Sequence, residues 1–168
     1  MTISMYQASV PVFIRMLNNL IGILEKAAAD AEARKIDPAV LINSRLYPDM
    51  FPLSRQIRIA ADAAAGGAAR LAGMEPPKNE NTETTFPELI ERIRTTIAYL
   101  STFKPGQIDG SEKRAVTLKV RDDTLTLDGL TFLLNRALPN FYFHITTTYG
   151  ILRHNGLEIG KKDYLGKF

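Results

Sequence analysis

His144 is the residue of this chain whose chemistry is most directly tied to a sequence pattern. It lies in an aromatic stretch that runs from residue 140 to residue 152. A helix that binds a metal ion commonly repeats its histidine one turn later, because positions i and i+4 share a face. One turn after His144 the chain has Thr148. The pattern therefore predicts a lone imidazole instead of a paired metal site.

Other metal donors are scarce. Catalytic zinc usually takes three protein ligands and structural zinc takes four, but the chain has two histidines and no cysteine. If both histidines lie on one helix, His144 and His154 are separated by about 15 Å along its axis and cannot share an ion. Asp49 and Asp62 are the carboxylates that could complement His144. We expect no cofactor; if a divalent metal does bind, we expect His144 to be a ligand.

Other catalytic and binding patterns are absent from the sequence. No serine has a nucleophile-elbow motif around it, and no glycine-rich phosphate loop is present. Gly66 and Gly67 fall inside an expected helix, where close helix packing explains them better than a ligand does. The net charge is +3, and the basic pairs at 113–114 and 161–162 are not interleaved with aromatic residues. Nucleic acid is therefore not an expected partner.

The expected location is the cytoplasm. The first residues show no basic group followed by an apolar run, so no signal peptide is predicted. No stretch approaches the roughly 20 apolar residues of a membrane span, so no membrane association is expected. The lack of cysteine suits a reducing compartment.

Four long amphipathic segments would position His144. The first runs from about residue 4 to 34, with Pro11 kinking it unless Ser9 caps the helix start. The second runs from about 52 to 72. The third is opened by a capping box at Thr85 and Glu88 and ends near residue 103. The fourth runs from about 129 to 154 and is interrupted by Pro139.

Shorter elements connect these segments. A short helix is predicted after the cap-and-proline pair at 37–38, and a loop rich in bulky residues spans 46–52. Alternating residues at 115–120 and 124–127 predict a small hairpin that turns around Arg121. In the tail, Tyr164, Leu165 and Phe168 should dock on the surface. Together these elements predict one all-α domain over residues 1–168, a four-helix bundle with a β-hairpin before the last helix.

The segment from His144 to Ile151 resembles the last-helix motif of DinB/YfiT-like bundles, which is typically H-x-x-x-H followed by R-G-Q. His144 matches the first histidine, Thr148 stands where the second would be, and Gly150 matches the glycine. A third ligand in that superfamily comes from the second helix, and the corresponding stretch here, 54–62, has no histidine. The whole chain resembles more closely an uncharacterised bacterial branch, through residues 5–13, 35–39, 49–53, 83–86 and 138–156.

This resemblance implies a cavity that has kept one of three metal ligands. We expect the pocket to be lined by His144, Thr148, Asn140, Tyr6, Arg55 and Asp49. Alternatively, the imidazole is a buried structural group hydrogen-bonded to Asn140 or Thr148. The neighbouring aromatic residues are more typical of a core or a dimer interface than of a stacking site: Phe141, Tyr142, Phe143 and Tyr149.

Three functions remain open at this point. The favoured hypothesis is a small-molecule-binding DinB-like bundle with a degenerate metal site. A metal-dependent transferase or hydrolase of the DinB/YfiT type is the second, by analogy with the superfamily. A homodimeric interaction protein without catalysis is the third, and a homodimer is the expected assembly. The residues do not decide whether the protein is an enzyme.

Overall fold

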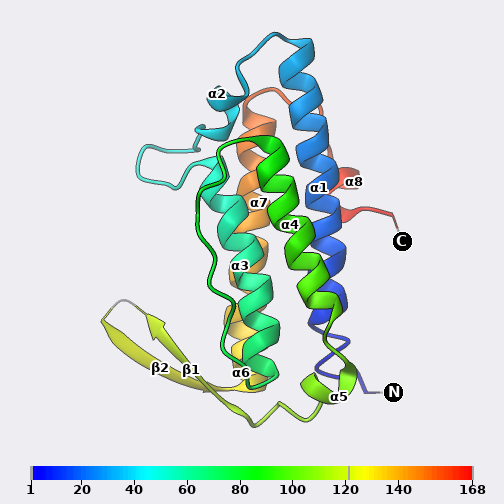
Figure 1. Ribbon diagram of the computed structural model, residues 1–168, viewed down its shortest axis with the longest axis vertical. Helices are drawn as coiled ribbons and strands as arrows, with labels where there is room; N and C mark the ends of the chain where they lie inside the picture. The colour runs from blue at the N-terminus through cyan, green and yellow to red at the C-terminus, as the bar shows by residue number, and fades with distance from the viewer. Residues whose placement is uncertain (1, 121, 168) are drawn as a thin grey trace.

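Four long helices lie side by side in the computed structural model, which describes residues 2–120 and 122–167 (Figure 1). They are α1 (Val10–Ala33), α3 (Leu53–Leu71), α4 (Phe86–Ser101) and α7 (Leu138–His154). Helix α1 packs on α4, α4 on α3, and α3 on α7, while α1 also contacts α3 and α7. The predicted helical bundle is confirmed.

Helix α1 begins at the later of the two starts that the sequence allows, directly after Ser9. Residues 5–9 form turns, and the helix starts at Val10. Pro11 therefore lies in the first helical turn, where its missing N–H costs no hydrogen bond, and the predicted kink does not arise. Ser9 precedes the helix, but its hydroxyl donates to the carbonyl of Met5 (2.6 Å) instead of capping α1.

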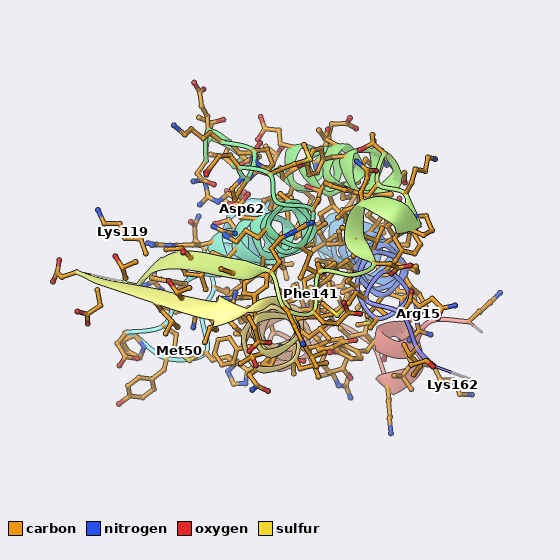
Figure 2. All side chains as sticks on the ribbon, turned by 90° about the horizontal axis from the view of Figure 1, so that it is seen from below. Arg15, Met50, Asp62, Lys119, Phe141 and Lys162 are labelled. Carbon is orange, nitrogen blue, oxygen red and sulfur yellow. The ribbon has the colours of Figure 1, made fainter. Side chains whose placement is uncertain are left out.

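The centre of the bundle is built on aromatic contacts between α1 and α7. The rings of Phe13 and Phe141 meet edge to face at 4.9 Å, and both side chains are fully buried. Figure 2 shows Phe141 among the helices, in the interior of the molecule. A Cβ on Gly67 of α3 would lie 3.2 Å from the Phe13 ring, so this glycine permits the close approach of α1 and α3. Close packing is the role that the sequence pattern predicts for it.

The last helix is interrupted before its proline. Residues Gly129–Phe132 form α6, Leu133–Ala137 form a π-helical turn, and α7 follows. The N–H of Leu138 donates to the carbonyl of Leu133, five residues back. Pro139 has no N–H and would crowd the carbonyl four residues before it, so the widened turn accommodates the proline at the start of α7. The predicted interruption is confirmed, in the form of a π-turn.

The hairpin consists of β1 (Ala115–Val120) and β2 (Asp123–Asp128), paired antiparallel with Ala115 opposite Asp128. It projects from the lower end of the bundle beside α3 (Figure 1). Val116 is buried, and Leu118 packs against the core, so one face of the hairpin rests on the helices. The predicted turn residue Arg121 lies outside the described residues.

Three short helices complete the chain: α2 (Pro38–Ile42), α5 (Pro105–Ile108) and α8 (Lys161–Leu165). The sequence pattern predicts α2 but neither α5 nor α8. Helix α8 docks the tail on α1, since Asn19 donates to the carbonyl of Tyr164 (3.0 Å) and Lys26 pairs with Asp163 (2.6 Å). Phe168, which was also expected to dock, lies outside the described residues.

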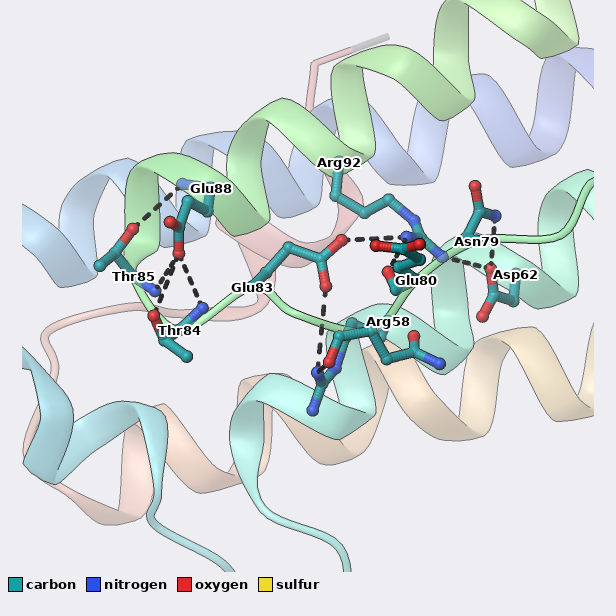
Figure 3. A network of polar contacts seen from close by, with 10 residues as sticks. Arg58, Asp62, Asn79, Glu80, Glu83, Thr84, Thr85, Glu88 and Arg92 are labelled. Atoms are coloured by element: carbon teal, nitrogen blue, oxygen red, sulfur yellow. Dashed lines mark hydrogen bonds and ion pairs between the residues drawn. The ribbon is translucent and has the colours of Figure 1, made fainter.

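A polar network fastens the segment between α3 and α4 to both helices (Figure 3). Arg92 of α4 is almost wholly buried and pairs with Asp62 of α3 (2.6 Å) and with Glu83 (2.9 Å). Asn79 also donates to Asp62 (3.1 Å). Asp62 is therefore engaged in the α3–α4 contact and does not complement His144, contrary to the expectation from sequence.

None of the described helices is both long enough and apolar enough to cross a membrane.

Candidate functional site

The imidazole of His144 hydrogen-bonds to Gln56 of α3. The imidazole is buried, with 8% of the residue exposed, and its Nδ1 lies 2.6 Å from Oε1 of Gln56. Gln56 is buried as well, and its Nε2 donates to the carbonyl of Phe51 (3.1 Å). The neighbours Asn140 and Thr148, considered from sequence, do not supply this partner.

The Gln56 amide determines which imidazole nitrogen carries the proton. Because Nε2 of Gln56 faces a carbonyl, its Oε1 faces His144 and accepts a hydrogen bond. Nδ1 of His144 must therefore be the donor. Burial also lowers the pKa of His144 below its ordinary value, which favours the neutral ring. The neutral ring then carries its lone pair on Nε2.

Nε2 of His144 is not completely shielded from solvent. It has no hydrogen-bond partner among the described residues, yet it is not one of their fully buried unpaired polar atoms. A cavity of about 220 Å³ lies beside the ring, and its surface is mainly apolar. We call it the His144 cavity, and its lining residues are Asp49, Met50, Phe51, Gln56, Phe143 and His144. The arrangement presents a neutral hydrogen-bond acceptor to a small apolar space.

The loop between α2 and α3 closes one side of this cavity. Met50 and Phe51 belong to it, and Arg55 at the start of α3 lies over the Phe51 ring at 3.6 Å from the ring centre. Such cation–π stacking helps to hold an exposed aromatic ring in place. On the α7 side, the Phe143 ring meets the His144 ring edge to face at 5.2 Å. The bulky loop therefore packs over the candidate site.

The six residues expected to share one pocket do not come together. Asp49 and His144 line the His144 cavity, while Asn140 and Arg55 line two other cavities. Thr148 is fully buried, and its hydroxyl donates to the carbonyl of His144 (2.9 Å). Thr148 stands where the DinB/YfiT-like motif has its second histidine. Its hydroxyl already hydrogen-bonds to a carbonyl of its own helix.

Tyr6 lies away from His144. It belongs to the turns before α1, and its N–H donates to Asp109 (2.8 Å), just after α5 at the lower end of the bundle. The expected contact of Tyr6 with the pocket is therefore not found.

A metal centre does not fit the donors around His144. The described residues contain no group of three or more histidine, cysteine, aspartate or glutamate side chains that could hold an ion. Asp49 is the one acidic residue that lines the His144 cavity. Two donors fall short of the three protein ligands of a catalytic zinc site.

The model of one protein family matches residues 5–165, which is nearly the whole chain. That family is DUF1993, a domain of unknown function. The chain belongs to the DUF1993 family. The crystal structure of a DinB family member from Shewanella denitrificans is similar to it, with 45% sequence identity and a TM-score of 0.88. The similarity covers 97% of this chain and 92% of that protein. No curated protein matches the chain.

Gln56 is the residue of this DUF1993 protein that sequence reasoning missed. It lies in the stretch 54–62, where the DinB/YfiT-like resemblance implies a third metal ligand. One signal was available: Gln56 is a polar residue on the apolar stripe formed by Leu53, Ile57 and Ala60. A buried polar side chain on such a stripe requires a partner, and here the partner is His144.

Proposed function

We propose that this DUF1993 protein is a small-molecule-binding bundle whose ligand contacts His144 in a degenerate metal site. The observation that carries the proposal is the open Nε2 of a neutral imidazole that Gln56 orients from the other side. A histidine that binds a metal is oriented in the same way, through a hydrogen bond from its second ring nitrogen. The geometry of a ligating histidine is thus present without a complete donor set.

The shape and polarity of the His144 cavity define the ligand class. Its walls are apolar and aromatic, which is typical of small-molecule sites that hold a few polar groups. The open Nε2 accepts a hydrogen bond, so the ligand should donate one. We infer a small apolar or aromatic molecule with one O–H or N–H group, and phenol is the simplest probe of that class.

Titration with phenol tests the proposal, followed by the imidazole resonances of ¹⁵N-histidine-labelled protein. Phenol should shift the His144 Nε2 resonance saturably, because Nε2 becomes a hydrogen-bond acceptor. Benzene, which has the same ring without a donor, should bind more weakly by about tenfold. His154→Ala, which removes the exposed histidine of the same helix, should bind phenol normally.

Replacing His144 provides the decisive comparison. His144→Phe keeps an aromatic ring in the cavity and removes the acceptor, so phenol should lose its advantage over benzene. The proposal is wrong if phenol and benzene bind equally to the unmodified protein, or if phenol binds His144→Phe as tightly as it binds the parent chain.

A homodimer is the second proposal, and the exposed apolar residues around the cavity mouth favour it. Phe143 is 55% exposed and Tyr47 is 66% exposed. Leu46 and Phe51, in the same loop as Tyr47, are exposed as well. Leu46 approaches Gly150 of α7, so this loop and α7 share one apolar surface. Sedimentation equilibrium should report a dimer that Tyr47→Lys weakens. A monomer at high protein concentration would exclude it.

The metal-dependent transferase or hydrolase, which was the second hypothesis from the sequence, finds no support in the donors of the site among the described residues.

A further inference from the structure

A second cavity lies where the hairpin meets the lower part of the bundle. It has a volume of about 180 Å³ and lies among α3, β1, the π-turn and the start of α7. Its polar lining consists of Arg70, Lys119, Arg136 and Asn140, and small or apolar residues form the remaining wall. We call it the hairpin cavity. No acidic residue lines it.

The cations of the hairpin cavity have no carboxylate partner. Among the described residues, no aspartate or glutamate comes within ion-pair distance of Arg70, Lys119 or Arg136. Arginines elsewhere in the chain do pair, as Arg92 and Arg94 show. Three positive charges surround one space, and Glu75 offsets that of Arg70 in part from beyond ion-pair distance. Together these charges produce a field that attracts an anion.

Arg70 is held in position at the edge of the cavity. Its Nη1 donates to the carbonyl of Gly66, one turn earlier in α3 (3.1 Å), and this is the one hydrogen bond of its side chain within the described residues. A Cβ on Gly66 would lie 2.6 Å from that nitrogen, so the glycine leaves room for the guanidinium. Burial lowers the pKa of Arg70, although Glu75 acts in the opposite direction. An anion would offset this burial of charge.

The π-turn places two polar residues at the same cavity. Arg136 lies in the π-turn and Asn140 lies four residues later in α7, on the other side of Pro139. The N–H of Leu138 donates to the carbonyl five residues back, which marks the widened turn. Such π-turns occur frequently at functional sites. The interruption therefore lies at a candidate ligand site as well as beside a proline.

We propose that the hairpin cavity binds a small phosphate, either the free ion or the phosphate group of a monoester. Guanidinium groups from Arg70 and Arg136 match the paired oxygens of a phosphate. Lys119 adds a third positive charge from β1, and the Asn140 amide can donate to a further oxygen. This site goes beyond the proposed function, since it uses a different cavity from that of His144.

Calorimetric titration with methyl phosphate tests the proposal, and inorganic phosphate and acetate serve as comparison anions. Methyl phosphate should bind saturably at low ionic strength. Arg136→Gln should weaken it about tenfold, because a charge-assisted hydrogen bond is lost. Arg136 is exposed, so this variant should fold, as circular dichroism will check. Asn140→Asp is a second variant, which places a negative charge in the cavity and should also weaken binding.

Lys161→Gln is the matched control, since it removes one positive charge from α8, on the other side of the bundle (Figure 1). It should leave the affinity for methyl phosphate unchanged, and so should His144→Phe. Tighter binding of methyl phosphate than of inorganic phosphate assigns the monoester, and the reverse order assigns the free ion. Acetate binding as tightly as both, equal losses in Arg136→Gln and Lys161→Gln, or no binding of either phosphate would overturn the proposal.

Discussion

The contact between His144 and Gln56 determines the chemistry of the candidate site at the scale of single residues. A carboxylate at position 56 would favour the charged imidazolium, whereas a neutral amide favours the neutral ring with its proton on Nδ1. Because Gln56 also donates to the carbonyl of Phe51, its orientation is fixed by the loop that covers the cavity. The loop and the imidazole are thereby coupled through one side chain.

Burial of His144 predicts a specific dependence of stability on pH. Its pKa is lowered in the folded protein, so the unfolded chain binds the proton more readily. The contribution of His144 to stability is therefore present above the unfolded pKa of about 6.5 and is lost as the pH falls toward the folded pKa. Urea unfolding at several values between about pH 7.5 and about pH 5 should show this loss.

The control for this prediction is the other histidine. His144→Phe should lose less stability on acidification than the parent chain, while His154→Ala should follow the parent chain. Acidic residues titrate in all three proteins, so the difference between variants is the quantity to compare. An identical acid response in His144→Phe and the parent would contradict the burial argument.

Gly66 offers a prediction in which stability and binding change in opposite directions. Alanine is better than glycine inside a helix by about 1 kcal/mol. The new Cβ would lie 2.6 Å from Nη1 of Arg70, so the guanidinium has to move. Gly66→Ala should therefore keep or slightly raise the melting temperature, and it should weaken methyl phosphate binding severalfold.

Gly22 of α1 is the matched position for this test. A Cβ there meets nothing within 4 Å, so Gly22→Ala gains helix propensity without displacing a side chain. It should leave methyl phosphate binding unchanged. If Gly66→Ala also leaves binding unchanged, Arg70 does not contact the anion.

At the scale of elements, ion pairs between side chains, instead of apolar packing, hold the chain between α3 and α4. Arg92 joins Asp62 of α3 to Glu83, and Arg58 of α3 approaches Glu83 at 3.9 Å (Figure 3). The side chains of Arg92 and Glu83 are largely buried, at 7% and 13% exposure. Removing one partner from such a network leaves the other charge without compensation.

Two arginines about half a turn apart on α4 test whether buried ion pairs hold the segment between α3 and α4. Arg92→Leu should lower the free energy of unfolding by about 3 kcal/mol, because it removes the closer partner of the largely buried Glu83 carboxylate and leaves it with Arg58 at 3.9 Å. Arg94→Leu removes an exposed arginine that pairs with Glu25 and Glu91, and it should cost less than about 1 kcal/mol. Denaturant unfolding monitored by circular dichroism measures both. Equal costs would show that the linker network adds nothing beyond surface pairs.

At the scale of the whole molecule, both proposed sites draw on α3 and α7. Helix α3 provides Gln56 to the His144 cavity and Arg70 to the hairpin cavity, and α7 provides His144 and Asn140, which lie one turn apart. The loop before α3 closes the first cavity, and the hairpin before α6 closes the second. These two connections between helices, which are the parts of the fold that differ most from a simple four-helix bundle, thus complete the two cavities.

A metal site would also require ligands from several helices, which leads to a prediction for the whole chain. The described residues supply no group of three donors, so added zinc should not raise the melting temperature through His144. The change in melting temperature on adding zinc should therefore be the same for the parent chain and for His144→Phe, and thermal melts with and without zinc measure it. One zinc per chain that disappears in His144→Phe would contradict this prediction.

Local sequence patterns predicted the four long helices, α2 and the hairpin, because these features depend on neighbouring residues. Thr85 and Glu88 form the predicted capping box, and Asp37 caps α2, as local propensity requires. The π-turn before Pro139 was not predicted, because its form depends on how the backbone around the proline is accommodated.

Which side chains share a cavity depends on the tertiary packing of the helices. Gln56 and His144 are 88 residues apart, and their contact depends on the packing of α3 against α7. The periodicity of a helix shows which residues share a face, but not which residue of another helix lies opposite. For the same reason the sequence grouped Asn140, Arg55 and Tyr6 with His144, whereas Asn140 and Arg55 line other cavities and Tyr6 bonds to Asp109 after α5. Three separated cations, from α3, β1 and the π-turn, become one site only when the hairpin rests on the helices.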